Sequence, residues 1–208
     1  MPKVYIEQSS GQYVQMFKDF GWEVIKDLGD EIPDLVCFTG GEDVTPSLYG
    51  EAKHPQTYNN PQRDHHEKQL FSEFVEADIP MVGICRGGQF LNVVNGGKMF
   101  QHVLGHTRSH PIYDLITDEV VFATSTHHQM MRPGVGHKLI AVADEHQSRQ
   151  YMKENTPTYY EGIDRDYEVV YYPNTRSLCF QPHPEFSGVN KLQTYFFSLI
   201  KRYLDIKE

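Results

Sequence analysis

The chain lacks the features of several large protein classes. It has three cysteines, Cys37, Cys85 and Cys179, and no CxxC pair, so neither a disulfide framework nor a cysteine-ligated zinc site is indicated. No apolar run approaches the ~18 residues of a membrane-spanning helix, and the first residues, MPKVYIEQSS, hold no apolar stretch of signal-peptide length. We therefore expect a cytoplasmic protein with reduced thiols and no membrane partner.

Positive charge is also scarce. The chain has 28 acidic against 19 basic residues and a formal net charge of -9. The overall electrostatic field of the protein therefore does not attract a phosphate backbone, and nucleic acid is not an expected partner. The phosphate-binding pattern G-x-x-x-x-G-K-[ST] is missing too. An ATP-dependent synthetase activity would therefore have to come from a separate protein.

The chain has enough apolar residues to form the hydrophobic core of one domain. The 208 residues are 39% hydrophobic, and we expect a single domain over residues 1–208. Short apolar runs alternate with helical patterns in the first half: KVYIE, WEVIK, DLVCF and MVGI are typical of strands, and residues 12–20 and 63–79 follow helical spacing. This order predicts an α/β fold, a doubly wound and mostly parallel sheet flanked by helices.

The second half has shorter and more polar strands. DEVVFA, HKLIAVA, YEVVYY and SLCF predict a small antiparallel extension. A closing helix follows, and its core face is expected to carry Leu192, Tyr195, Phe196, Leu199 and Tyr203. Residues 42–62 and 144–166 are expected to be long irregular stretches, which in compact domains are usually functional or disordered.

Cys85 lies where a strand meets a helix, in GICRGGQ. A sharp turn of this kind exposes its side chain above the sheet, close to the N–H groups of the helix, and Gly83, Gly87 and Gly88 leave room for the backbone. The helix dipole favours the thiolate, the form that attacks carbonyl carbon. An isolated cysteine on a strand is more often a buried packing residue, and Cys37 and Cys179 fit that description.

A base and an orienting acid are predicted in SLCFQPHPEF. His183 follows an apolar strand that can end at the same edge of the sheet as Cys85, and Glu185 stands two residues later, where its carboxylate can fix the imidazole tautomer. A surface loop with an incidental histidine and glutamate is the alternative for this segment alone. Because the cysteine turn is also present, we favour a nucleophile with its base.

These residues carry a resemblance to a known family. GICRGGQ followed by QPHPE resembles the class I glutamine amidotransferase superfamily, whose fold is flavodoxin-like. FTGGEDVTPSLYG and QRDHHE resemble the gamma-glutamyl hydrolase-like branch, peptidase family C26, and NGGKMFQHV and STHHQ follow in the expected order. The resemblance covers essentially the whole chain.

The resemblance implies a role for each matching position. Cys85 is the expected nucleophile, His183 the general base and acid, and Glu185 the orienting carboxylate. The expected oxyanion hole is formed by the backbone N–H groups of Gly41 and Arg86. The residues expected to bind the alpha-amino and alpha-carboxylate groups of a glutamyl substrate are Gln89, Ser125, Thr126, His127, His128 and Gln129.

The expected activity is cysteine-dependent hydrolysis of the gamma-glutamyl amide bond of a small molecule through a gamma-glutamyl thioester, with no cofactor. A metal at His127 and His128 is not favoured, because no acidic or cysteine partner stands at ligand spacing. The alternatives are a glutaminase subunit that passes ammonia to a separate synthetase, and a non-catalytic binding protein. The family's D-G-x-x-E-A segment has no clean counterpart in YYEGIDRDYEVVYYPN, which leaves the amine leaving group open.

Overall fold

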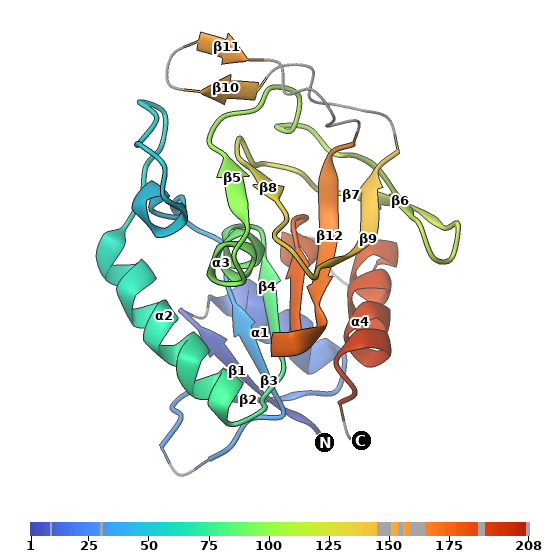
Figure 1. The fold of residues 1–208 in the computed structure, drawn as a ribbon. Helices are drawn as coiled ribbons and strands as arrows, with labels where there is room; N and C mark the ends of the chain where they lie inside the picture. The colour runs from blue at the N-terminus through green and yellow to red at the C-terminus, as the bar shows by residue number, and fades with distance from the viewer. Residues whose placement is uncertain are drawn as a thin grey trace.

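The fold is built on a nine-stranded sheet (Figure 1). The computed structural model describes residues 1–8, 10–29, 31–144, 165–186 and 190–206, together with the backbone of 151–153 and 156–158. In spatial order the strands are β2 (Glu23–Ile25), β1 (Lys3–Glu7), β3 (Leu35–Phe38), β4 (Met81–Ile84), β13 (Ser177–Phe180), β12 (Tyr167–Tyr172), β9 (Lys138–Ala143), β6 (His110–Asp114) and β7 (Val120–Ala123).

The sheet has a parallel and an antiparallel half. Strands β2, β1, β3, β4 and β13 run parallel, whereas β12, β9, β6 and β7 follow as antiparallel neighbours. The whole of β3, β4 and β13 is buried, as expected for parallel strands that are covered on both faces. The predicted mostly parallel sheet with an antiparallel extension is therefore confirmed.

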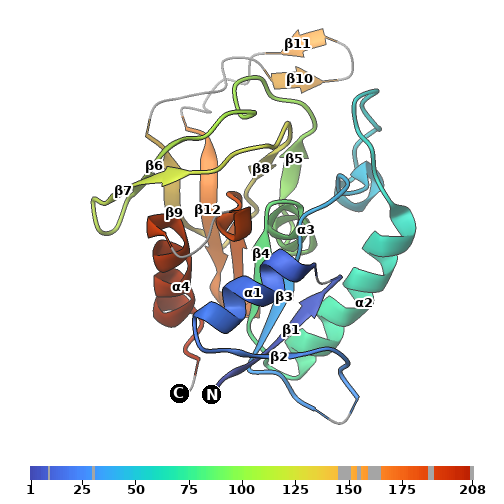
Figure 2. The same cartoon turned by 180° about the vertical axis from the view of Figure 1, so that it is seen from behind.

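Helices cover both faces of the parallel half. Helices α1 (Gly11–Asp19) and α4 (Lys191–Tyr203) contribute to one apolar core, and α2 (Pro61–Glu76) and α3 (Arg86–Val94) contribute to the other. Figure 1 shows α2 and α3 in front of the sheet, and Figure 2 shows α1 on the opposite side. Among the described residues, no helix has both the length and the apolar character that crossing a membrane requires.

The helix ends follow local sequence chemistry. Asn60 precedes α2 and its side-chain oxygen accepts the Arg63 N–H at 3.2 Å, while Pro61 occupies the first turn, where its missing N–H costs nothing. Asn190 caps α4 in the same way, accepting the Gln193 N–H at 3.0 Å. The predicted core face of α4 is confirmed for Leu192, Tyr195, Phe196 and Leu199, and Tyr203 is half-buried.

One strand assignment was wrong. SLCF forms β13, which pairs antiparallel with β12 but parallel with β4, so it belongs to the parallel core rather than to the extension alone. Its continuous burial is the physical reason. Several short elements were not predicted: β6, the pair β5 (Lys98–Phe100) and β8 (Met130–Arg132), and the hairpin β10 (Tyr151–Lys153) and β11 (Thr156–Thr158). The rest of the loop expected over 144–166 lies largely outside the described residues.

Candidate active site

Cys85 stands at a strained turn between β4 and α3. Its backbone has φ 52° and ψ -113°, a positive φ that is uncommon for a residue with a side chain. The turn is held because the Cys85 N–H donates to the Phe180 carbonyl at 2.8 Å, and because Gly87 lets α3 approach the sheet. A Cβ at Gly87 would lie 2.1 Å from the Phe38 carbonyl oxygen, so this position requires glycine.

His183 and Glu185 follow β13, the parallel neighbour of β4. The pairing of Phe180 with Ile84 brings the segments after the two strands to the same edge of the sheet. The His183 Nδ1 lies 2.7 Å from Glu185 Oε1, and because an ionised carboxylate only accepts, Nδ1 carries the hydrogen. The other ring nitrogen, Nε2, is left for the Cys85 thiol.

Two neighbours that the sequence analysis missed hold His183 in place. Its N–H lies 3.3 Å from the Thr124 carbonyl, and the Thr124 hydroxyl donates to the His183 carbonyl at 2.6 Å. Phe186 stacks on the imidazole, with ring centroids 4.2 Å apart and planes at 5°. The positions of these residues, one before STHHQ and one after HPE, are the signals that could have identified them.

The environment of His183 favours its charged form. Burial by itself lowers the pKa of His183, but hydrogen bonds and charge interactions with Cys85 and Glu185 raise it to about 10. By contrast, burial raises the pKa of both Cys37 and Cys179, and these thiols are 0% exposed in the core. Cys85 is therefore the cysteine that interacts with an imidazole whose charged form is favoured.

The two residues expected to supply the oxyanion donors, Gly41 and Arg86, line the same pocket as Cys85. Arg86 is the first residue of α3, so its backbone N–H has no acceptor within the helix. Gly41 follows β3 with φ +144°, and a Cβ there would lie 2.2 Å from the Arg63 guanidinium. Tyr13, which the sequence analysis also missed, accepts the Gly40 N–H at 3.1 Å. Burial and the nearby Glu185 charge raise the pKa of Tyr13, so it remains a neutral phenol.

A buried group of four charged side chains lies behind this loop. Arg63 Nε donates to Glu67 Oε1 at 2.7 Å, and the Arg86 guanidinium bonds to both Glu67 and Asp64. The exposed fractions of these side chains are at most 3%. Two positive and two negative charges balance one another, as a group buried this deeply requires.

The same charged group fixes the loop that follows β3. The Arg63 guanidinium donates to the Thr39 carbonyl at 2.9 Å and to the Gly40 carbonyl at 3.0 Å, and Asp64 accepts the Thr45 N–H at 2.9 Å. These contacts give Arg63 and Asp64 a structural role in the loop. They hold in place the backbone on both sides of Gly41, whose N–H is an expected oxyanion donor.

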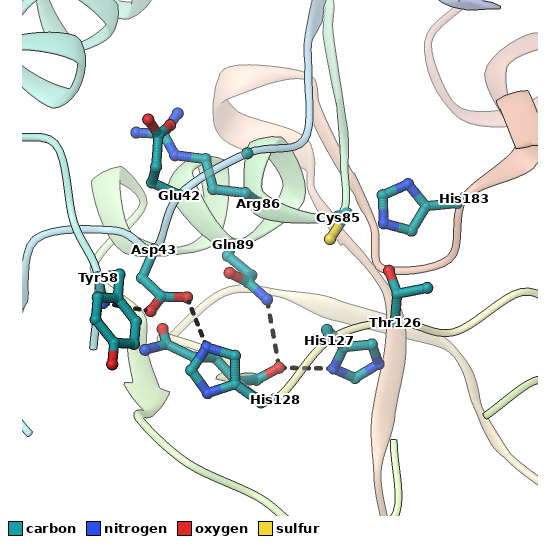
Figure 3. Close-up of a pocket in the computed structure, with 12 residues that line it drawn as sticks. Glu42, Asp43, Tyr58, Cys85, Arg86, Gln89, Thr126, His127, His128 and His183 are labelled. Carbon is teal, nitrogen blue, oxygen red and sulfur yellow. Dashed lines mark hydrogen bonds and ion pairs between the residues drawn. The ribbon is translucent and has the colours of Figure 1, made fainter. Parts of the chain in front are cut away.

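A cavity of about 310 Å³ opens beside Cys85 (Figure 3). Its lining residues are Gly41, Glu42, Asp43, Tyr58, Cys85, Arg86, Gln89, Thr126, His127, His128, Gln129 and His183. Most of the residues expected to bind substrate are therefore brought together. Ser125 is not, because it is buried behind the wall and its hydroxyl donates to the His106 carbonyl at 2.5 Å.

The wall opposite the thiol carries charge. His128 Nε2 lies 3.2 Å from Asp43 Oδ1, and Asp43 also accepts the Tyr58 N–H at 2.8 Å. Figure 3 shows these three residues across the pocket from Cys85 and His183. Glu42 and Tyr58 were missed by the sequence analysis, because they come from the long loop over 42–62, where no periodicity indicates which side chains face inward.

Comparison with known proteins identifies the family. The family model for peptidase C26 matches residues 4–149. The chain belongs to peptidase family C26. This places it in the class I glutamine amidotransferase superfamily, a group of hydrolases and amidotransferases. A glutamine amidotransferase-like protein of Lactococcus lactis subsp. lactis is 30% identical over 211 residues, which cover 87% of this chain and 80% of the relative.

Solved structures of other proteins share the fold of this chain. A glutamine amidotransferase from Thermotoga maritima superposes with a TM-score of 0.61 at 15% identity, covering 98% of this chain and 83% of that one. Two further relatives, from Lactococcus lactis subsp. cremoris and Mycobacterium tuberculosis, are matched over 55% and 51% of their own length, so the chain spans about half of each. The carbamoyl phosphate synthase small chain of Wigglesworthia glossinidia brevipalpis is 28% identical over 134 residues, which cover 62% of this chain and 32% of that protein.

Proposed function

We propose that this C26 protein hydrolyses the gamma-glutamyl amide bond of a small molecule through a thioester on Cys85. The observation that carries the proposal is the paired geometry of the strained Cys85 turn and the His183–Glu185 pair, with Nδ1 to Oε1 at 2.7 Å. An imidazole oriented in this way presents Nε2 to the thiol. The raised pKa of His183 supports an imidazolium beside Cys85 in the resting state.

The first half of the reaction forms the thioester. The Cys85 thiolate attacks the delta-carbonyl carbon, and the oxygen that becomes negative is held by the N–H groups of Gly41 and Arg86. When the carbon–nitrogen bond breaks, His183 Nε2 gives its proton to the departing amine. The products at this stage are a free amine and a gamma-glutamyl thioester.

Water completes the cycle. His183, now neutral, accepts a proton from the attacking water, and the same two N–H groups hold the second oxyanion. Breakage of the carbon–sulfur bond releases glutamate and returns the thiolate, which again faces an imidazolium. Glu185, which accepts the Nδ1 hydrogen, keeps the ring in one tautomer.

The pocket wall offers a carboxylate and an imidazole to the two ends of the glutamyl group. We assign the alpha-ammonium to the Asp43 carboxylate and the alpha-carboxylate to His128, which lie 3.2 Å apart in the free protein. Gln89 supports the wall, because its amide nitrogen donates to the Gln181 side chain at 3.1 Å. His127 lines the same wall, and its Nδ1 donates to the Gln129 carbonyl at 2.7 Å.

Ammonia donation to a separate synthetase is the second candidate. It is favoured by the similarity to a carbamoyl phosphate synthase small chain. In that case glutamine is the substrate and the same thioester chemistry releases ammonia to a docked partner.

A glutamine analogue with a diazoketone tests the proposed nucleophile. We expect one covalent adduct on Cys85 and none on the core thiols Cys37 and Cys179, which are 0% exposed. Cys85→Ala should abolish glutamate release, and His183→Ala should reduce it by about 10²–10⁴-fold. Cys179→Ala is the matched control, and we expect this variant to be labelled on Cys85 and to remain active. An adduct on Cys37 or Cys179, or an active Cys85→Ala protein, would contradict the proposal.

A further inference from the structure

A second group of chemically reactive side chains lies behind the pocket wall, and the proposed reaction uses none of them. It consists of His106, His110, Asp166 and Glu168, whose exposed fractions are 0%, 4%, 0% and 0%. His110 begins β6 and Glu168 lies in β12, so the group joins two strands that are not neighbours in the sheet. We call these four residues the His–carboxylate cluster.

Hydrogen bonds at the outside of the cluster fix both imidazole tautomers. His106 Nε2 lies 3.0 Å from Asp166 Oδ2, and His110 Nδ1 lies 3.1 Å from the Arg108 carbonyl oxygen. Ionised carboxylates and carbonyls only accept, so these two ring nitrogens carry hydrogen. The opposite nitrogens, Nδ1 of His106 and Nε2 of His110, are then the lone-pair nitrogens when the rings are neutral.

Both lone-pair nitrogens face one carboxylate. Glu168 Oε1 lies 3.5 Å from His106 Nδ1 and 2.9 Å from His110 Nε2. Within the described part of the chain, His106 Nδ1 and Glu168 Oε2 make no hydrogen bond although both are buried. Two lone pairs directed at a carboxylate repel it unless a positive charge lies among them.

We propose that the His–carboxylate cluster binds one divalent transition metal ion of the zinc class. The ligands are His106 Nδ1, His110 Nε2 and the Glu168 carboxylate, whose donor atoms all lie within 4.8 Å of one another. Tetrahedral ligation with bonds of about 2.0 Å places donor atoms about 3.3 Å apart. The observed separations of 2.9 and 3.5 Å lie on either side of that value.

The hydrogen bonds around His106 and His110 resemble those usually found around metal-binding histidines. A carboxylate or a carbonyl accepts the second N–H of each ligating ring, as Asp166 and the Arg108 carbonyl do here. The pairing of β12 with β9 is irregular around Glu168, between Tyr167 and Val169, which is how a strand can turn a side chain inward. Two imidazoles and one carboxylate select against Ca²⁺ and Mg²⁺, which prefer oxygen ligands.

The ion would stabilise the pocket wall without entering the hydrolytic reaction. The His106 ring lies 4.5 Å from the His127 ring, and His127 lines the pocket. The His106 carbonyl also accepts the Ser125 hydroxyl. Metal at His106 therefore holds the segment from Ser125 to His127 against β12. This inference does not depend on the proposed hydrolysis.

The experiment measures bound zinc in the full chain. Cys85→Ala serves as the background, because Cys85 and His183 could otherwise take up zinc themselves. After chelation and re-equilibration with Zn²⁺, we expect one equivalent of retained metal by elemental analysis and a rise in Tm. Glu168→Gln and His110→Asn should each reduce retention to near zero. His102→Gln is the matched control and should retain one equivalent, because His102 belongs to a separate group with His128.

A second measurement decides the matter if the ligand variants do not fold. Crystals of the Cys85→Ala protein soaked with Zn²⁺ should show an anomalous peak among His106, His110 and Glu168. Zinc that is retained equally by Glu168→Gln and the background protein, or a peak only at other histidines, would overturn the proposal. No retained zinc at all would show that a proton, rather than a metal, supplies the positive charge.

Discussion

At the scale of single residues, the proposed chemistry depends on the protonation of His183. Folding raises the pKa of His183 from 6.5 to about 10, because its interactions with Cys85 and Glu185 outweigh burial. The stability that this pair contributes is therefore complete below pH 6.5 and is lost as the pH rises through about 10. The proton that the leaving amine needs disappears over the same window.

We predict that kcat/KM for a gamma-glutamyl amide falls on the alkaline side near pH 10, where His183 loses its proton. Glu185→Gln removes one interaction that raises the pKa of His183, so this decline should move to lower pH, with a smaller loss of rate than in His183→Ala. A pH series of kcat/KM measures both effects. Glu31→Gln, on the surface beside Lys3, is the matched control. An alkaline decline at the same pH in wild type and Glu185→Gln would contradict this account.

The residues that could be predicted from sequence are those within compact motifs. Cys85, His183 and Glu185 stand beside glycines or prolines whose local geometry follows from residue type. Tyr13 and Thr124 reach the site only through the packing of distant segments, so no local pattern predicts them. Ser125 lies outside the pocket lining for a related reason, because adjacent residues of an irregular segment face different sides.

At the scale of elements, the turn from β4 into α3 depends on close backbone contact. We predict that Gly87→Ala lowers the free energy of unfolding by about 2–3 kcal/mol, because its Cβ would lie 2.1 Å from the Phe38 carbonyl oxygen and α3 would have to shift. Gly11→Ala in α1 is the matched control, since its Cβ would meet no atom within 4 Å, and it should stay within about 1 kcal/mol of wild type. Chemical denaturation measures both variants. Equal stability of the two would contradict the close-packing argument.

Gly88 makes a similarly close backbone contact with a different strand, β13. A Cβ on Gly88 would lie 2.9 Å from the Phe180 backbone nitrogen. In this protein α3 therefore packs closer to β13 than a larger residue would allow.

Short apolar runs predict where strands form, but they do not predict which strands pair with one another. LVCF, MVGI and SLCF each predict a buried strand. The direction of pairing depends on the connections between strands, which a local pattern does not contain. For this reason the SLCF pattern predicts a strand of the antiparallel extension, whereas β13 also pairs parallel with β4. The short pairs β5–β8 and β10–β11 have too few residues to show a period.

At the scale of the whole molecule, we predict that the purified chain alone releases glutamate from gamma-glutamyl amines. The Cys85, His183 and Glu185 side chains and both expected oxyanion donors come from this one chain, so the proposed site is complete within it. Glutamate release from a panel of gamma-glutamyl amides and from glutamine is the measurement. Turnover that stays at background until a synthetase is added would instead favour ammonia donation.

The pairing of β4 with β13 joins segments that are made at different times during synthesis. Cys85 and His183 are roughly a hundred residues apart in the sequence, and parallel pairing over such a distance carries a large loop-closure cost. During synthesis, the first half of the chain leaves the ribosome with its cysteine but without its base. In the proposed mechanism the thiol therefore gains its base only when β13 docks beside β4, so an incomplete chain would lack the pair that attacks the amide.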